Sequence, residues 1–519
     1  MTTHRDAAAA LGIALVALAA FILMNPGRID IIDGQWRFEV AYNLARDSSL
    51  SVEDPALRRS GLPGKNGERF SVYGISGSLA GLPLVAAANA LIPENRDLAQ
   101  FMFAQTSSIW GATGLALLFL IYRQLGLSSK KSLGWVAVVG CSTLYLPLST
   151  STFDQVQNAA LLLWSVYAAY RAKQTRSILM AATGAAAFAL LINYREANAI
   201  FLPALLYASG VTHWRWMGKQ LLQDPVARVF MIGAMAGGAV WVGLNYARFG
   251  TLFPPSGMGY HPPAFGNPVR GLAVLTVSPA KGLLWYTPPI IFCMMGWKQF
   301  RTTHRRLADA VATGTASWIA LIASLTFAGG DWCWGPRYWV VVLPLMFLAA
   351  PYAQLPSRTS RILAGTVIGL GLVIQMLAVS VDHQRFFFER SLTPFFWYID
   401  ESFYFRESAL LSRVREIGRL ESPASSPITL PFRPGPHPES LTYTIFGPSG
   451  DELKRPMDWI ARYRVFSLPR PWPLWSAAIP DARIQHWRSS LINGLFLTGA
   501  CGFGLMAWGL RAGREGRLT

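Results

Sequence analysis

The chain is dominated by stretches of apolar residues long enough to cross a lipid bilayer. A membrane span needs about 20 mostly apolar residues, and twelve stretches reach or approach that length: 7–24, 99–122, 133–150, 156–170, 177–193, 197–211, 229–247, 282–297, 308–328, 338–353, 362–380 and 489–510. Only 14% of the 519 residues are charged, whereas a soluble domain has about 25%. The pattern predicts an all-α polytopic membrane protein with about twelve transmembrane helices.

The formal net charge of +18 is unevenly distributed over this pattern. Lys and Arg gather in the loops on one side of the predicted spans: before residue 7, at 123–132, 171–176, 212–228, 298–307 and 354–361, and in the C-terminal tail. Because cytoplasmic loops carry an excess of Lys and Arg, we expect both termini in the cytoplasm. The high charge therefore does not indicate a nucleic-acid partner.

The opposite, extracytoplasmic side receives four substantial segments: 25–98, 248–281, 329–337 and 381–488. Residues 71–92 are apolar enough to cross the membrane, but a crossing would place the basic loop 123–132 outside. We therefore favour an interfacial or re-entrant segment, and a crossing remains the alternative. The expected organisation is a transmembrane module over 1–380, a small extracytoplasmic domain of α/β or irregular structure over 381–488, and a last span with a basic tail over 489–519.

Acidic side chains occur at the outer ends of several predicted spans. Asp33 begins a helix-like stretch after the first span, and Asp154 lies in the turn before 156–170. Each could simply cap the helix that follows, but a carboxylate at the membrane surface can also take a proton from an incoming hydroxyl. Arg195 and Glu196 occupy a third outer turn, where they could pair with each other.

Two further outer loops carry cations, glycines and aromatic residues. Lys281 precedes the span 282–297, where it could anchor the helix by snorkelling. Arg337 begins the span 338–353 after a loop with three glycines, on the side where positive charge is scarce. Guanidinium groups bind phosphate in a bidentate manner. The donor-phosphate candidates are therefore Arg337, Lys281 and Arg195, and the sugar or acceptor candidates are Trp334, Tyr338, Tyr286, Glu196 and Asp331.

The order of these features resembles the GT-C glycosyltransferases, in particular lipid A aminoarabinose transferases and protein O-mannosyltransferases. The resemblance rests on Asp33 with the stretch 34–46 after the first span, on 73–91 as a second juxtamembrane segment, and on the loops 278–286 and 330–338. Many relatives carry Asp-Glu in the first loop, whereas this chain has Asp33-Gly34, so Asp154 becomes the candidate second carboxylate. The resemblance implies juxtamembrane helices in the first outer loop and a multi-pass protein of a bacterial inner membrane.

The resemblance also implies an inverting glycosyltransferase that uses a polyprenyl-phosphate-linked sugar on the extracytoplasmic side. Asp33 and Asp154 are the catalytic candidates. The expected partners are membrane lipid, which surrounds the protein, and a glycan, lipid or protein that serves as the acceptor. We predict no required cofactor or metal, because the histidines lack metal-ligand spacing, although the two carboxylates could bind a divalent cation. An oligosaccharide ligase with a pyrophosphate carrier and a non-enzymatic polyprenyl-lipid transporter or flippase are the alternatives.

Overall fold

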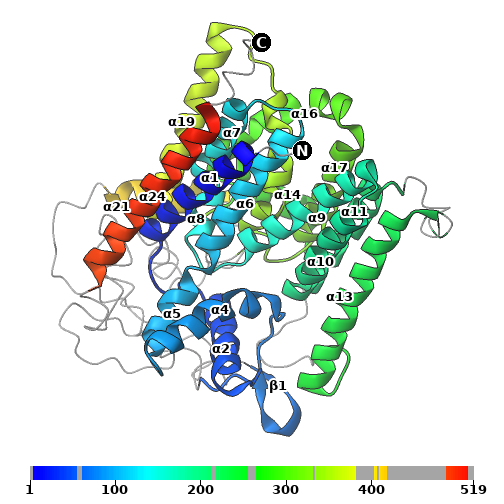
Figure 1. Ribbon diagram of the computed structural model, residues 1–519, viewed down its shortest axis with the longest axis vertical. Helices are drawn as coiled ribbons and strands as arrows, with labels where there is room; N and C mark the ends of the chain where they lie inside the picture. Colours follow the sequence, from blue (N-terminus) through cyan, green and yellow to red (C-terminus); the bar gives the residue numbers. More distant parts are fainter. Residues whose placement is uncertain are drawn as a thin grey trace.

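The computed structural model describes residues 4–54, 61–211, 218, 220, 223–254, 265–330, 333–380, 403–405, 408–417 and 487–511. These residues form a helical body (Figure 1). The strands among them are the two-residue β1 (Leu62–Pro63) and β2 (Arg69–Phe70), which pair antiparallel. The predicted domain 381–488 lies largely outside the described residues, which include from it 403–405 and a helix, α21 (Ala409–Ile417).

Within the described part of the chain, five helices are long and apolar enough to cross a membrane, by length and composition. They are α1 (His4–Met24), α5 with α6 (Arg96–Gln124), α13 (Pro225–Phe249), α19 (Arg358–Ser380) and most of α24 (Arg488–Arg511). They coincide with five of the twelve predicted spans, and the total of about twelve stays a prediction.

Several other predicted spans consist of short helices joined end to end. The stretch 133–150 contains α7 (Ser129–Ser142) and α8 (Tyr145–Ser149), and 282–297 contains α15 (Leu283–Tyr286), η4 (Pro288–Ile290) and most of α16 (Ile291–Thr303). The stretch 338–353 likewise contains most of η5 (Arg337–Val341), α18 (Leu343–Phe347) and η6 (Ala350–Tyr352). Prolines lie within α8, η4, α18 and η6, and proline lacks the amide hydrogen that a continuous helix requires.

The centre of the body is α9 (Gln155–Thr175), whose residues are buried along almost its whole length. It packs against α6 (Thr106–Gln124), α10 (Ile178–Tyr194), α11 (Leu202–Ser209) and α17 (Arg305–Ala323). The short helix η2 (Glu196–Phe201) joins α10 to α11, and α14 (Pro268–Thr276) packs on α17. A side chain at the first residues of α9 is therefore surrounded by protein.

Two helices of the first predicted outer loop form a separate group at one end of the body, together with α5 at the start of the next predicted span (Figure 1). α2 (Ile32–Asp47) and α4 (Ser76–Leu91) pack together, and α5 (Arg96–Ala104) lies against both. Phe38, Val85 and Phe103 contribute to their shared apolar core. The apolar stretch 71–92 thus contains one 16-residue helix that packs on α2, and its interfacial position stays a prediction.

The first and last described helices, α1 and α24, pack antiparallel through glycines. A Cβ atom on Gly502 would lie 2.8 Å from the carbonyl oxygen of Gly12, and one on Gly509 would lie 2.7 Å from that of Arg5. Small residues allow such close backbone approach between membrane helices. The start of α1 and the end of α24 therefore lie at the same end of the body, away from α2, α4 and α5 (Figure 1).

This packing predicts that Gly502→Val lowers the melting temperature of the protein in detergent. Overpacking a tight contact destabilises by roughly 1–3 kcal/mol. Gly504→Val is the matched control, because a Cβ there meets no atom within 4 Å while the change in helix propensity is the same. Equal melting temperatures for the two variants would contradict the tight contact of α1 with α24.

Candidate active site

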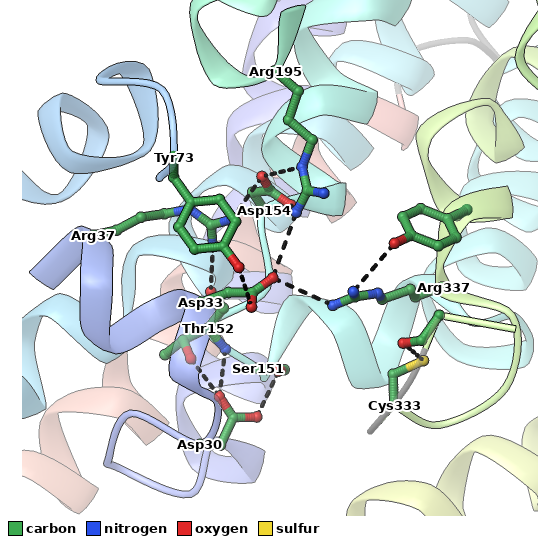
Figure 2. Close-up of polar contacts among 12 residues, drawn as sticks. Asp30, Asp33, Arg37, Tyr73, Ser151, Thr152, Asp154, Arg195, Cys333 and Arg337 are labelled. Carbon is green, nitrogen blue, oxygen red and sulfur yellow. Dashed lines mark hydrogen bonds and ion pairs between the residues drawn. The ribbon is translucent and has the colours of Figure 1, made fainter. Parts of the chain in front are cut away.

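Asp33 lies in the first turn of α2, and its carboxylate contacts three other segments (Figure 2). One oxygen, Oδ1, accepts a hydrogen bond of 2.6 Å from the hydroxyl of Tyr73. The other, Oδ2, lies 3.5 Å from Nη2 of Arg195 and 3.6 Å from Nη1 of Arg337. The N-cap of α2 is Ile31, with no side-chain cap, so the capping role considered for Asp33 is not the one observed. Its side chain is 13% exposed.

Asp154 immediately precedes α9, and its side chain also makes no capping hydrogen bond. Its Oδ2 atom accepts from Nη2 of Arg37 at 2.9 Å and from Nε of Arg195 at 3.1 Å. With 1% of its side chain exposed, this carboxylate is fully buried. Arg195 therefore pairs with Asp154 and Asp33, and not with the neighbouring Glu196 as considered from the sequence.

Arg37 belongs to this site, although it is not among the site residues predicted from the sequence. It follows Asp33 by four residues on α2, so both side chains lie on one face of the helix. Its guanidinium group lies 4.9 Å from the centre of the Tyr73 ring, and its Cδ atom would be 2.6 Å from a Cβ on Gly77. The i, i+4 spacing of an acid and a base at the start of a juxtamembrane helix is the signal that could have identified it.

Asp30 connects the start of α2 to the turn that carries Asp154. Its carboxylate accepts hydrogen bonds from Ser151 Oγ at 2.5 Å and from the backbone amide and Oγ1 of Thr152 at 2.8 and 2.5 Å. Gly34 permits this approach, because a Cβ there would lie 2.3 Å from Thr152 Oγ1. The glycine at this position thus has a packing reason in this chain.

Arg337 begins η5 after the glycine-containing loop and is 95% buried. Its guanidinium group stacks on Phe153 at 4.3 Å and lies 5.0 Å from the ring centre of Tyr338. Nη2 donates to the Tyr338 hydroxyl at 3.3 Å. Gly335 has a φ of +65°, a left-handed conformation that glycine adopts readily, and it directs the chain toward Arg337.

Lys281 supports the loop before Arg337. Its Nζ atom donates to the carbonyl oxygen of Cys333 at 2.7 Å and lies 3.4 Å from the Cys333 sulfur. The ammonium group is thus bound to the backbone of the loop that positions Arg337. This geometry favours a supporting role over the direct phosphate contact predicted from the sequence.

The aromatic candidates fall into two groups. Trp334 and Tyr286 are fully buried and pack edge to face with ring centres 5.4 Å apart, so in this conformation neither ring presents a surface to a sugar. Tyr338 contacts Arg337 directly. Glu196 is exposed at the start of η2, and Asp331 lies outside the described residues.

The guanidinium groups determine the charge of both carboxylates. Burial alone would raise the pKa of Asp33, but Arg337, Arg37 and Arg195 outweigh it and hold this pKa below its usual value. For Asp154, burial is likewise outweighed, chiefly by Arg195 and Arg37, and the pKa is lowered to about 2. Burial, followed by the charge of Asp33, raises the pKa of Tyr73, which therefore stays a hydrogen-bond donor.

Asp33, Arg37, Tyr73, Asp154, Arg195 and Arg337 form what we call the Asp33 cluster. Three guanidinium groups surround two carboxylates, which leaves one formal positive charge. Asp30 lies beside them but is bound to hydroxyl and amide groups. Among the residues that the structure describes, no three His, Cys, Asp or Glu side chains are placed to hold a metal ion. The cluster is suited to bind an anion.

Comparison with solved structures finds neighbours of similar fold. Neither a protein-family model nor a curated protein matches the sequence. The chain is similar in structure to ArnT from Cupriavidus metallidurans in the apo state. The match has a TM-score of 0.47 and 12% identity, and it covers 78% of this chain and 72% of that chain. The roles of individual residues in this chain follow from their own contacts.

The pKa of Asp154 predicts a pH-dependent contribution to stability. A carboxyl group with a pKa of 3.8 when unfolded and about 2 when folded stabilises the fold above about pH 4. This contribution is lost as the pH falls through about 2. We expect the melting temperature of the wild type to fall more steeply between these values than that of Asp154→Asn, which is less stable at neutral pH. The two proteins have all other acidic residues in common. Parallel curves of melting temperature against pH would therefore contradict the lowered pKa of Asp154.

Proposed function

We propose that the protein is an inverting glycosyltransferase that moves a sugar from a polyprenyl-phosphate donor to an acceptor hydroxyl. The observation that carries the proposal is the position of Asp33 between two guanidinium groups. Its distances of 3.5 and 3.6 Å to Arg195 and Arg337 exceed those of ordinary hydrogen bonds. An anion that binds between these two cations would therefore lie beside a carboxylate able to accept a proton.

An apolar groove that includes Trp339 of η5 supports a lipid-linked donor over a soluble one. It has a volume of about 840 Å³ and lies among α14, α16 and α17, with Trp297, Val311 and Trp339 among its lining residues. Trp339 is two residues from Arg337 on η5. A prenyl chain in the groove would contact the same short helix, η5, that carries Arg337.

The reaction proceeds by direct displacement. The acceptor hydroxyl gives its proton to Asp33 while its oxygen attacks the anomeric carbon, and the bond from this carbon to the phosphate oxygen breaks. Attack opposite the leaving group inverts the anomeric configuration. Arg337 and Arg195 stabilise the charge that develops on the departing phosphate, while Lys281 holds the loop before Arg337.

The lowered pKa of Asp33 makes it a weak base in the free protein. A bound phosphate would attract Arg337 and Arg195 away from Asp33 and add a negative charge nearby. Both changes raise the pKa of a carboxyl group. The donor would thus strengthen the base that acts on the acceptor.

Asp154 has the different role of a positioning residue. Its buried carboxylate holds Arg37 and Arg195 at hydrogen-bond distance, so proton transfer is assigned to Asp33 alone. Tyr338 and the exposed Glu196 are the proposed sugar or acceptor contacts, and a glycan, lipid or protein supplies the acceptor hydroxyl. Trp334, Tyr286 and Asp331 stay predictions from the sequence.

The distribution of charge supports an extracytoplasmic site in a bacterial inner membrane. Arg123, at the end of α6, donates to Asp6 in the first turn of α1, whereas Asp33 follows the other end of α1. The basic residues 123–131 and Asp33 therefore lie at opposite ends of the membrane-spanning body. Because positive loops face the cytoplasm, Asp33 faces outward, and both termini are cytoplasmic.

The direct test is Asp33→Asn in purified membranes supplied with a polyprenyl-phosphate sugar and an acceptor. We expect transfer to fall by about 100-fold or more, the usual contribution of a general base, with donor binding retained. Asp47→Asn, an exposed acid at the end of the same helix, is the matched control and keeps full activity. Mass spectrometry of the product distinguishes one transferred sugar from a whole glycan.

A folded Asp33→Asn variant with wild-type transfer rates would remove Asp33 as the base. Transfer of an intact oligosaccharide would instead replace the proposal with a ligase.

A further inference from the structure

The segment 71–76, which carries Tyr73, is held from one side by the end of α13. Nη1 of Arg248 donates to the carbonyl oxygen of Ser71 at 3.2 Å and to that of Tyr73 at 3.4 Å. Nη2 donates to Oδ1 of Asn245 at 2.8 Å, one turn earlier in the helix. One guanidinium group thus connects α13 to two carbonyl groups of this segment.

The other side of the segment lies against the end of α10. A Cβ atom on Gly74 would be 2.1 Å from the carbonyl oxygen of Asn193, so only glycine permits this contact. The hydroxyl of Ser76 donates to the carbonyl oxygen of Leu190 at 2.9 Å. The backbone around Tyr73 is therefore fixed between α13 and the turn that leads to Arg195.

From this backbone the Tyr73 side chain reaches Asp33 (Figure 2). Its ring lies beside the guanidinium groups of Arg37 and Arg195, at 4.9 and 5.8 Å from the ring centre. A hydrogen bond depends steeply on distance and angle, so a shift of the 71–73 backbone would weaken the 2.6 Å contact between Tyr73 and Asp33.

We infer that Arg248 is a positioning residue of the site, which holds the carbonyl groups of Ser71 and Tyr73 so that the Tyr73 hydroxyl donates to Asp33. The role of Asp33 as base rests on the proposed function, but the positioning itself does not. The oxygen atoms that Arg248 binds belong to carbonyl and amide groups. Among the described residues no carboxylate pairs with it: two of its hydrogen bonds hold the carbonyl groups of Ser71 and Tyr73, and the other two anchor the guanidinium group to α13.

The hydrogen bond from Tyr73 affects the titration of Asp33. A hydrogen bond donated to a carboxylate favours the ionised form, so loss of the Tyr73 contact raises the pKa of Asp33. The other charged groups around Asp33 are Arg37, Arg195, Arg337, Asp154 and the neighbouring Asp30. The hydrogen bonds of Arg248 reach none of them. The three arginines therefore still lower the pKa of Asp33 when Arg248 is replaced. Only the part of the lowering that comes from the Tyr73 hydrogen bond is lost.

The experiment is an infrared pH titration of the full-length protein in detergent, with the Asp33 carboxyl signal isolated by subtraction of the Asp33→Asn spectrum. We expect the midpoint of the Asp33 titration to move to higher pH in Tyr73→Phe and in Arg248→Gln. In the double variant the midpoint moves no further than in Tyr73→Phe alone. Arg248→Lys, which keeps the charge but cannot span both carbonyl groups, shifts the midpoint less. Arg228→Gln, an exposed arginine on the same helix, leaves it unchanged.

An unchanged midpoint in Arg248→Gln, with a shifted one in Tyr73→Phe, would overturn the inference. Additive shifts in the double variant would do so as well, because independent residues add and coupled residues do not. Should Arg248→Gln fail to fold, the intermediate shift of Arg248→Lys carries the test, and its absence would count against the inference. The titration requires no transfer, so a protein without glycosyltransferase activity would refute the proposed function and leave this result standing.

Discussion

The site depends on the buried contact of Asp154 with Arg37 and Arg195. Asp154 lies at the start of the central helix α9, and the two arginines come from α2 and from the end of α10. Removing one partner of a buried ion pair costs roughly 3–5 kcal/mol, because the remaining charge is left without compensation. The contact therefore keeps these three segments together, and Arg195 carries the connection on to Asp33.

The two carboxylates of the site differ in their surroundings, and this difference separates their roles. Asp154 is fully buried and hydrogen-bonded to both of its arginines at about 3 Å. Asp33 is partly exposed, with one short hydrogen bond from Tyr73 and two longer ion pairs. Neighbouring carboxyl groups with unlike environments commonly divide structural and proton-transfer roles in this way. In this protein the looser, more accessible group is the one that a substrate can reach.

Much of the site could be predicted from the position of charges relative to apolar spans. Asp33, Asp154, Arg195 and Arg337 all lie in predicted outer turns, and the structure brings them into one cluster. Arg37 could not be selected in the same way, because it lies within an amphipathic helix where an arginine usually faces solvent. Its burial depends on Gly77 of α4, a contact between separate helices that local sequence does not encode.

The aromatic residues and the number of spans show where local patterns are insufficient. Trp334 and Tyr286 stand beside glycines in outer loops, a pattern that favours an open binding surface, yet they pack on each other in the core. Their burial depends on Gly335, which turns the loop inward. Similarly, hydropathy marks 282–297 and 338–353 as single spans, whereas their prolines divide them into short helices.

The central claim is that the cations of the Asp33 cluster bind the phosphate of a lipid donor, and a structure of the protein with polyprenyl phosphate bound tests it most directly. The account predicts the phosphate in contact with the guanidinium groups of Arg337 and Arg195, within reach of Asp33, and the prenyl chain in the groove beside Trp339. A phosphate bound elsewhere, with Arg337 and Arg195 still paired to Asp33, would contradict it.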